Sequence, residues 1–152
     1  MKAVIQRVSK ASVTVEDKTI SQIDQGMVIL LGVKKGDTEK EAELLARKAA
    51  HLRIFSDEQE KMNLSLKDIK GQALVVSQFT LYGNCKKGRR PSFIEAALPK
   101  TADALYQYFI LCLQKERIIV KTGQFQTMMQ VNISNEGPVT IILNSEMLTV
   151  KS

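Results

Sequence analysis

Five consecutive apolar residues, Met27 to Leu31, lie between Gly26 and Gly32. A run this short is typical of a strand, and a strand without polar residues must be covered on both faces. This stretch, like every other apolar run in the chain, is far shorter than the roughly 18 residues that a membrane-spanning helix needs. The run therefore predicts a covered sheet, and we expect no membrane span.

Two segments have the apolar spacing of amphipathic helices long enough to cover that sheet. The first follows a possible cap at Asp37-Thr38, and the second starts at Pro99. The apolar face of the first consists of Ala42, Leu45, Ala46, Ala49 and Leu52. The corresponding face of the second consists of Ala102, Leu105, Phe109, Cys112 and Leu113, which makes Cys112 a core residue.

Short stretches rich in β-branched residues predict the remaining strands. They are 2–15 with an irregularity near Ala11, a weaker strand at 19–23, a strand at 73–83 that becomes polar at its end, and strands at 118–122, 128–133 and 139–143. A turn, SNEGP, separates the last two, and 53–71 is a strand end followed by a surface loop. We predict an α/β fold in one domain, 1–152, with mixed and largely antiparallel sheet layers packed by two helices.

Charge favours an anionic partner, with nucleic acid the first candidate. The chain has a formal charge of +6, and its 44% hydrophobic and 25% charged residues are ordinary for a folded protein. Four cations without an acid, Lys86, Lys87, Arg89 and Arg90, lie in the segment 84–92, which glycine and proline make a loop. This loop either binds phosphates, with Tyr82 and Phe93 stacking on bases, or is merely solvated.

Metal, disulfide and thiol chemistry have little support in this sequence. Cys85 and Cys112 form no CxxC motif, and His51 is the only histidine, so we expect no metal and no cofactor. The cations around Cys85 would favour its thiolate, but no histidine is available to serve it as a base. We expect free thiols and a structural or solvated His51. The N-terminus lacks the apolar centre of a secretory signal, which favours an intracellular protein.

Two polar segments remain, Ser77-Gln78-Phe79-Thr80-Leu81 and Asn135-Glu136-Gly137-Pro138-Val139-Thr140. Together with MKAVIQRV, LRIF, KMNLSL, KKGRRPSF, TGQF and MQV, in this order from Met1 to about Ser145, they make the chain similar to the D-aminoacyl-tRNA deacylases, also called D-tyrosyl-tRNA deacylases. The two segments match the family motifs SQxTL and NxGPxT. Residues 146–152 lie beyond the resemblance.

The resemblance implies a cytoplasmic enzyme that hydrolyses the ester between a D-amino acid and the terminal ribose of tRNA. It also implies a homodimer, in which the NxGPxT segment of one subunit enters the pocket of the other. By this likeness the Gly137-Pro138 bond would be cis and Arg7 would help to hold the turn. A cis X-Pro bond has a high barrier to rotation, so this backbone would form a stiff wall.

Such a wall would select the D-residue by steric clash. If the carbonyls of Gly137 and Pro138 meet the α-ammonium group, only a D-residue turns its α-hydrogen toward the wall. An L-residue would drive its side chain into the backbone. Glycine has no side chain to exclude, so glycyl-tRNA, including glycine mischarged on the alanine tRNA, is an expected substrate.

The hydrolytic step has two possible arrangements around Ser77 and its neighbours. Thr80 is either a nucleophile or a water-orienting hydroxyl, yet no base lies near it in the sequence. We favour backbone N–H groups around Gln78, Phe79 and Thr80 that stabilise the oxyanion, assisted by the vicinal ribose hydroxyl. Phe79, Phe125 and Met129 would line the site of the terminal adenine, although core packing explains Phe125 and Met129 equally well.

Two other functions remain open at this point. A non-catalytic basic RNA-binding module would use the cationic loop and would be indifferent to changes at Gly137-Pro138. A thiol- or threonine-dependent amidohydrolase would act on free D-amino-acid peptides and need no RNA. Removing the tRNA part of the substrate separates both from a deacylase.

Overall fold

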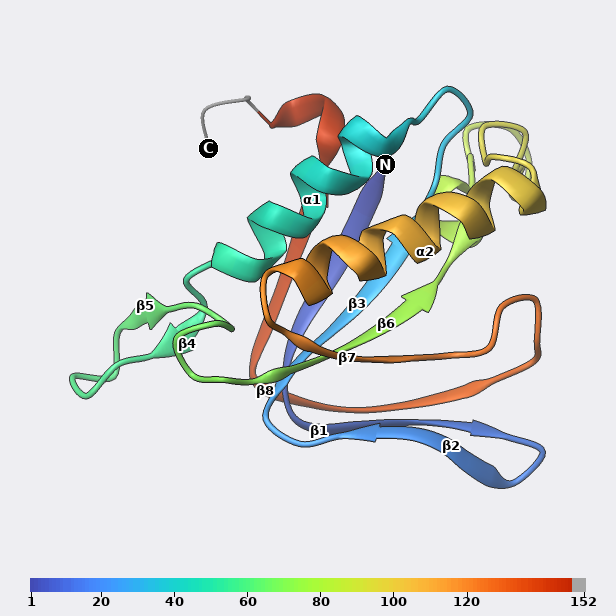
Figure 1. The fold of residues 1–152 in the computed structure, drawn as a ribbon. Coiled ribbons are helices and arrows are strands. Elements are labelled where there is room, and N and C mark those ends of the chain that lie inside the picture. The colour runs from blue at the N-terminus through green and yellow to red at the C-terminus, as the bar shows by residue number, and fades with distance from the viewer. Residues whose placement is uncertain (149–152) are drawn as a thin grey trace.

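A computed structural model describes residues 1–148 of the chain. It contains two helices beside a mixed sheet (Figure 1), which confirms the predicted fold class. The helices are α1 (Glu39–His51) and α2 (Pro99–Lys115). The strands are β1 (Lys2–Val15), β2 (Lys18–Ile23), β3 (Gly26–Gly32), β4 (Phe55–Ser56), β5 (Met62–Leu64), β6 (Gln72–Ser77), β7 (Ile119–Thr122) and β8 (Gln130–Asn144), with short 3-10 turns at Phe79–Tyr82 and Ser145–Met147.

The main sheet has the strand order β2-β1-β3-β6-β7, and β8 also pairs with β1. β1 is antiparallel to β2, β3 and β8, whereas β3, β6 and β7 run parallel to one another. Both long strands, β1 and β8, change direction partway along their length (Figure 1). β1 can therefore pair with β3 through its first half and with β2 through its second half.

Two apolar clusters stabilise this arrangement on opposite faces of the sheet. The larger lies under the helices and contains Ile5, Ile29, Leu45 and Phe109, all fully buried. The smaller lies where the β1–β2 hairpin folds over the parallel strands, and it contains Val8, Val13, Ile23, Val28 and Leu74. The central strand β3 contributes to both clusters, as its continuous apolar run predicts.

The helix boundaries agree closely with the sequence pattern. The Thr38 side chain accepts a hydrogen bond from the Lys40 N–H, and Glu41 reaches back to the Thr38 N–H, which forms a capping box. α2 begins at Pro99 as predicted, and Cys112 is buried on its inner face. Burial raises the pKa of the Cys112 thiol, as expected for a core cysteine. No helix within residues 1–148 is long and apolar enough to cross a membrane.

The predicted irregularity near Ala11 is confirmed, because β1 shifts register on both sides of it, at Val13/Thr14 toward β2 and around Val8 toward β8. Three other strand predictions needed correction. β6 ends at Ser77, and a 3-10 turn replaces the polar end of the strand predicted at 73–83. The region 53–71 contains a small hairpin, β4–β5. Finally, 134–138 is not a turn between two strands, because β8 runs through it as one strand.

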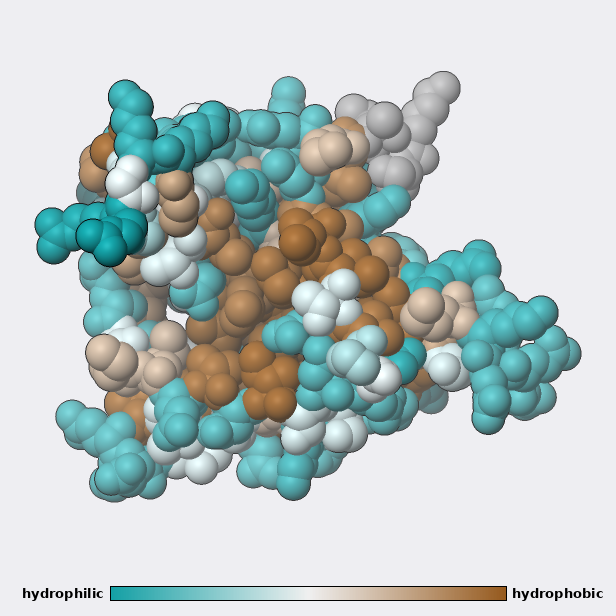
Figure 2. Space-filling model, turned by 180° about the vertical axis from the view of Figure 1, so that it is seen from behind, coloured by the Kyte–Doolittle hydropathy of each residue, from teal (hydrophilic) through white to brown (hydrophobic). Residues whose placement is uncertain are grey.

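The sheet face opposite the helices exposes apolar side chains. Figure 2 shows a hydrophobic area in the centre of this face. Val4 and Leu30 are half-buried there, and Ile142, which pairs with Val4 across the β1–β8 ladder, is 71% exposed. A patch of this kind on an otherwise polar surface is typical of an interaction site.

Candidate active site

A cavity of about 790 Å³ opens at the end of β6, between the start of α2 and the loop that joins β7 to β8. Its wall comes mainly from three parts of the chain, namely 76–79, the segment 96–99 with the inner face of α2 at Ala102 and Tyr106, and 123–129, and is completed by Lys35, Phe93 and Val131. Most of the lining area is apolar, and polar atoms come from Lys35, Ser77, Gln78, Gln124, Gln126 and Thr127. A concave, largely apolar site with few polar groups is typical of small-molecule binding.

The SQxTL segment forms one edge of this cavity, but only in part. Ser77, Gln78 and Phe79 line it, whereas Thr80 is exposed and does not. The Gln78 backbone N–H donates to the Leu31 carbonyl at 2.8 Å, and the Gln78 side-chain amide donates to the Thr80 hydroxyl. The prediction that Gln78 offers a free backbone donor is therefore wrong. Phe79 and Thr80, whose amides come first in the 3-10 turn, have no acceptor within it.

Tyr106 connects three walls of the cavity, and sequence analysis assigned it no role. Its buried hydroxyl donates to the Val75 carbonyl at 2.7 Å, and the same carbonyl accepts the Gly123 N–H at 3.3 Å. Burial raises the pKa of the Tyr106 phenol far above its ordinary value, so the hydroxyl remains a donor. α2, β6 and the loop at 123–129 are thus fixed to one another at one atom. The only signal in the sequence was an aromatic residue at a helical core spacing.

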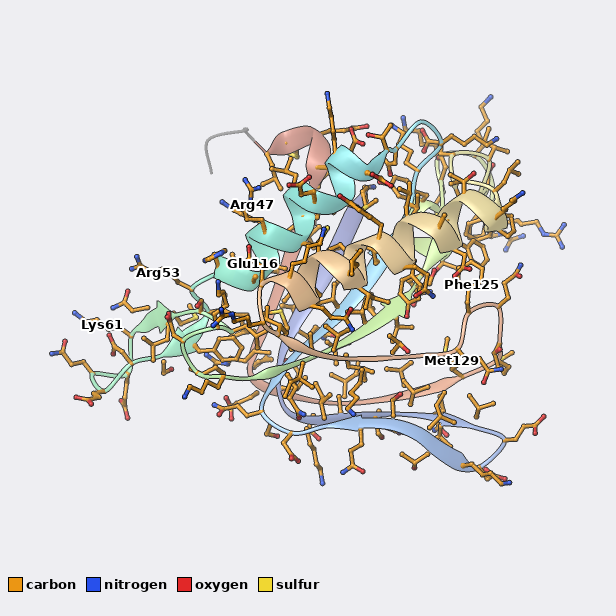
Figure 3. All side chains as sticks on the ribbon, in the orientation of Figure 1. Arg47, Arg53, Lys61, Glu116, Phe125 and Met129 are labelled. Atoms are coloured by element: carbon orange, nitrogen blue, oxygen red, sulfur yellow. The ribbon has the colours of Figure 1, made fainter. Side chains whose placement is uncertain are left out.

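Phe125 and Met129 both line the cavity, from the loop between β7 and β8 (Figure 3). The Phe125 ring lies 6.3 Å from the Tyr106 ring, centroid to centroid, and is half-buried. The Met129 sulfur accepts the Gln124 N–H at 3.3 Å. These contacts place both side chains at the cavity wall, where they are also packed against the apolar clusters.

The NxGPxT segment is a bulge in β8. Gln6 of β1 pairs with Thr140 and Val8 pairs with Asn135, so Arg7 alone faces the four residues 136–139. Gly137 and Pro138 are exposed on this bulge, and the peptide bond between them is cis. Proline is tolerated in a sheet at such positions because the ladder bond is already broken there.

Side chains at both ends of the bulge hold its shape. The Arg7 guanidinium donates from Nε to the Glu136 carbonyl at 3.1 Å and from Nη1 to the Ile54 carbonyl at 2.7 Å. Across the bulge, Asn135 Oδ1 accepts the Val139 N–H at 3.1 Å, and Asn135 Nδ2 donates to the Thr140 hydroxyl at 3.0 Å. These roles of Asn135 and Thr140 were not predicted from the sequence, although asparagine commonly bonds nearby backbone in turns.

Gly137 is required by this geometry. Its φ of +124° is rarely adopted by other residues, and a Cβ there would lie 2.9 Å from both Arg7 Nη2 and Val139 Cγ2. The guanidinium therefore approaches the backbone at a point where only a hydrogen atom fits.

The four cations of the loop at 84–92 are exposed, and none takes part in an ion pair found within residues 1–148. Phe93 follows the loop and is 37% exposed, but Tyr82 is only 4% exposed. The Lys2 ammonium lies 4.8 Å from the centroid of the Tyr82 ring. Tyr82 is therefore a packing residue, and the prediction that it stacks on bases is wrong.

His51 and Cys85 lie outside both motif regions. The His51 ring, about half exposed, contacts the Glu116 carboxylate at 3.2 Å, and Lys67 binds the same carboxylate at 2.7 Å. This group is a surface ion-pair cluster. Cys85 is exposed and not in a disulfide, and no group of three or more His, Cys, Asp or Glu residues that could hold a metal occurs in the described part of the chain.

Within one chain, the cavity and the bulge remain apart. Ser77, Gln78, Phe79, Phe125 and Met129 line the cavity, whereas Arg7, Gly137 and Pro138 do not. The structure thus presents a concave apolar site and a separate, exposed backbone projection that is held by arginine and asparagine.

Comparison with known sequences points to one family. The family model for D-Tyr-tRNA(Tyr) deacylase matches residues 4–144. D-aminoacyl-tRNA deacylase of Thermotoga petrophila is 54% identical over 97% of this chain and 99% of its own length. The protein of the same name from Dehalococcoides mccartyi strain BAV1 is 59% identical over 95% of each chain.

Two solved structures share the fold. The c-Myc DNA Unwinding Element Binding Protein has a TM-score of 0.90 and 45% identity, covering 95% of this chain and 98% of its own. A probable eukaryotic D-amino acid tRNA deacylase has a TM-score of 0.78 and covers 93% of this chain and 97% of its own, but at 19% identity it supports the fold alone. This chain belongs to the D-Tyr-tRNA(Tyr) deacylase family, and both curated relatives carry the name D-aminoacyl-tRNA deacylase.

Proposed function

We propose that this chain hydrolyses the ester bond of D-aminoacyl-tRNA in the cytoplasm and releases free tRNA and the D-amino acid. One observation carries the proposal. In a chain more than half identical to curated deacylases, SQxTL borders the apolar cavity and NxGPxT forms an exposed, clamped bulge. Residues 1–152 would act as a single deacylase domain, without metal or cofactor.

The active unit would be a homodimer with its two sites at the interface. The exposed Gly137-Pro138 bulge does not line the cavity within residues 1–148, so one subunit alone does not bring the bulge and the cavity together. The apolar face with Ile142 offers a surface that a second subunit would cover. One subunit would then place its bulge in the cavity of the other.

The bulge would reject L-residues by steric clash. The carbonyls of Gly137 and Pro138 would accept bonds from the substrate's α-ammonium group, which leaves the space beside the α-carbon closed to any side chain. Arg7 and Asn135 support this role because their hydrogen bonds hold both ends of the bulge. Glycine would pass this filter, so glycyl-tRNA would be hydrolysed as well.

At the other side of the cavity, the ester carbonyl would lie near the 3-10 turn. The Phe79 and Thr80 N–H groups would stabilise the oxyanion, since the Gln78 N–H is already bound to Leu31. An aminoacyl ester is activated, so a vicinal ribose hydroxyl and a positioned water would suffice. Gln78 would then act through its side chain, which donates to the Thr80 hydroxyl, and Ser77 would contact the substrate.

The tRNA end would occupy the apolar part of the cavity. Phe125 and Met129, with Phe79 at the edge, would pack against the terminal adenine. Phosphates that precede it would contact Lys86, Lys87, Arg89 and Arg90, which adds sequence-independent and salt-sensitive affinity.

The decisive experiment compares deacylation rates of D-tyrosyl-, L-tyrosyl- and glycyl-tRNA at one salt concentration. We expect fast loss of the D-ester and the glycyl ester and sparing of the L-ester. Equal background rates for all three would refute the proposal. A D-tyrosyl peptide without RNA serves as the substrate of the competing amidohydrolase, and we expect it to stay intact.

A second candidate is nucleic-acid binding without turnover. It is favoured by the exposed cationic loop, and the structural relative at TM-score 0.90 is named as a protein that binds a DNA element. This function predicts RNA or DNA retention that depends on the loop and is unchanged by substitution at Gly137. The deacylation assay above distinguishes the two, because only the enzyme shows D-specific turnover.

A further inference from the structure

Phe93 lines the cavity beside Phe79 and has no part in the proposed hydrolysis. Its ring is 5.0 Å from the Phe79 ring, centroid to centroid, at an interplanar angle of 72°. A carbon of the ring also lies 3.1 Å from the position that a Cβ on Gly83 would occupy, so the ring packs against that backbone. The remaining 37% of Phe93 is exposed. The Phe93 ring, held by its edge-to-face contact with Phe79, is therefore partly exposed at the cavity.

The backbone that carries Phe93 is fixed to the sheet. The Phe93 carbonyl accepts the Ala96 N–H at 3.1 Å, which forms a turn. This turn is bound to the segment after β3, because Lys35 N–H donates to the Glu95 carbonyl at 2.9 Å and Lys34 bridges to Ala96. The ring is thus preorganised, and the protein loses little conformational entropy when a ligand binds it.

The cationic loop ends directly before this ring. Its base is closed by two backbone bonds between Asn84 and Ser92, at 2.7 and 2.9 Å, so residues 85–91 project as a unit. The four exposed cations of that loop therefore stand beside Phe93. An exposed aromatic ring next to phosphate-binding charges is the arrangement with which proteins bind single-stranded nucleic acid.

We propose that Phe93 is a stacking site for the base that precedes the terminal adenosine, and that the loop cations bind the adjoining phosphates. The inference rests on the proposed function, because it assumes that the aminoacylated adenosine fills the cavity. Phe79 then marks the boundary of that nucleotide, and Phe93, which touches Phe79 edge to face and directly follows the cationic loop, meets the next one. Since every base has a π-face, this site would read a single-stranded 3′ end and not a base sequence.

The direct test measures stacking without turnover. The probe is a short single-stranded RNA that ends in adenosine, with the fluorescent base 2-aminopurine at the preceding position. We expect the wild-type protein to quench this base on binding. Phe93→Leu keeps an apolar side chain against Phe79 but removes the π-face, so quenching should be lost and affinity should fall about tenfold. Phe93→Tyr should restore both.

A kinetic test separates stacking from a role in shaping the cavity. For D-tyrosyl-tRNA, Phe93→Leu should raise KM about tenfold and leave kcat unchanged. For the D-tyrosyl ester of adenosine alone, which lacks the preceding nucleotide, the variant should match the wild type. Ile94→Ala is the matched control, because Ile94 is 73% exposed and does not line the cavity.

Unchanged quenching in Phe93→Leu, or none in the wild type, would overturn the inference. So would equal losses on both esters, since the ring would then act through the cavity wall. Failure of the proposed function gives a different result: quenching that depends on Phe93, without D-specific turnover of any ester.

Discussion

The cavity at the end of β6 and the bulge in β8 are built in opposite ways. The cavity gathers segments that are far apart in the sequence, and Tyr106 joins three of its walls at the Val75 carbonyl. The bulge is a local stretch of four residues that faces Arg7 and exposes its backbone. A concave site can contact a ligand alone, whereas a clamped projection acts only on something placed against it. The difference explains why the proposed chiral filter needs two subunits.

Gly137→Ala should have the largest effect on activity, because it acts on the bulge itself. The new Cβ would meet Arg7 Nη2 and Val139 Cγ2 at 2.9 Å, and the φ of +124° would be strained, so the bulge must deform. Strain of about 1–3 kcal/mol predicts a fall in D-tyrosyl-tRNA deacylation of about fivefold to 150-fold.

Gly36→Ala is its matched control. Gly36 also has a positive φ, +91°, but an added Cβ there would meet nothing within 4 Å. This variant should lose some thermal stability and keep the wild-type rate. A wild-type rate in Gly137→Ala would show that the bulge does not contact the substrate.

Arg7→Lys should loosen the bulge without removing charge. A lysine cannot bond the Glu136 and Ile54 carbonyls together as the guanidinium does. Hydrogen bonds to charged groups contribute about 1.5–3 kcal/mol, so we expect a lower melting temperature and a loss of D-ester hydrolysis of about tenfold. Arg47→Lys changes an exposed arginine on α1 and should alter neither. Equal effects of the two substitutions would contradict the clamp.

Thr80→Ala changes a residue beside the cavity and should lower activity less than the two substitutions at the bulge. Thr80 is exposed and lies outside the cavity lining, so removal of its hydroxyl should lower kcat less than about tenfold. Single-turnover deacylation of D-tyrosyl-tRNA measures this directly. A loss of more than about a thousandfold would identify Thr80 as the nucleophile.

Glu116→Gln concerns neither region and should have the smallest effect. The Lys67 ammonium, at 2.7 Å, and then His51 hold the pKa of the Glu116 carboxyl below its ordinary value. The charged pair therefore contributes stability above about pH 4.3, at most about 1 kcal/mol, and loses it as the pH falls through the lowered pKa.

Thermal melts of both proteins from pH 7 to pH 3 measure this contribution. The difference between wild type and variant should shrink toward acid, while D-ester hydrolysis at pH 7 stays unchanged. A difference that grows toward acid would mean that the pair does not stabilise the fold.

The helices and central strands were predictable because their signals are local. Thr38 caps α1, Pro99 starts α2, and the apolar run at Met27 to Leu31 forms the strand that is covered on both faces. The bulge was not predictable in this way. Asparagine, glycine and proline in 134–138 indicate a turn, and the partner that keeps the strand continuous, Arg7, is distant in the sequence.

The candidate site was predictable only where a motif marks it. Ser77, Gln78 and Phe79 border the cavity as expected, but Tyr106 and Leu98 looked like ordinary helix-face and loop residues. Tyr82 shows the opposite error, because an aromatic residue near a basic loop proved to be buried beneath Lys2. Spacing along the chain does not reveal which side of a turn faces a cavity.

The hydrogen bonds at both ends of the bulge also fix the length of the backbone that projects between them. The β1–β8 pairing resumes at Gln6 and Thr140 on one side of the bulge and at Val8 and Asn135 on the other. The four residues between are therefore held at both ends by fixed strand pairs. One inserted residue would add up to about 3.5 Å of chain to the projection. If this segment closes a partner's cavity, the number of residues in the bulge sets how far it extends into that cavity. Changes of residue count would then be tolerated far less here than in the exposed loop at 84–92, whose tip is free.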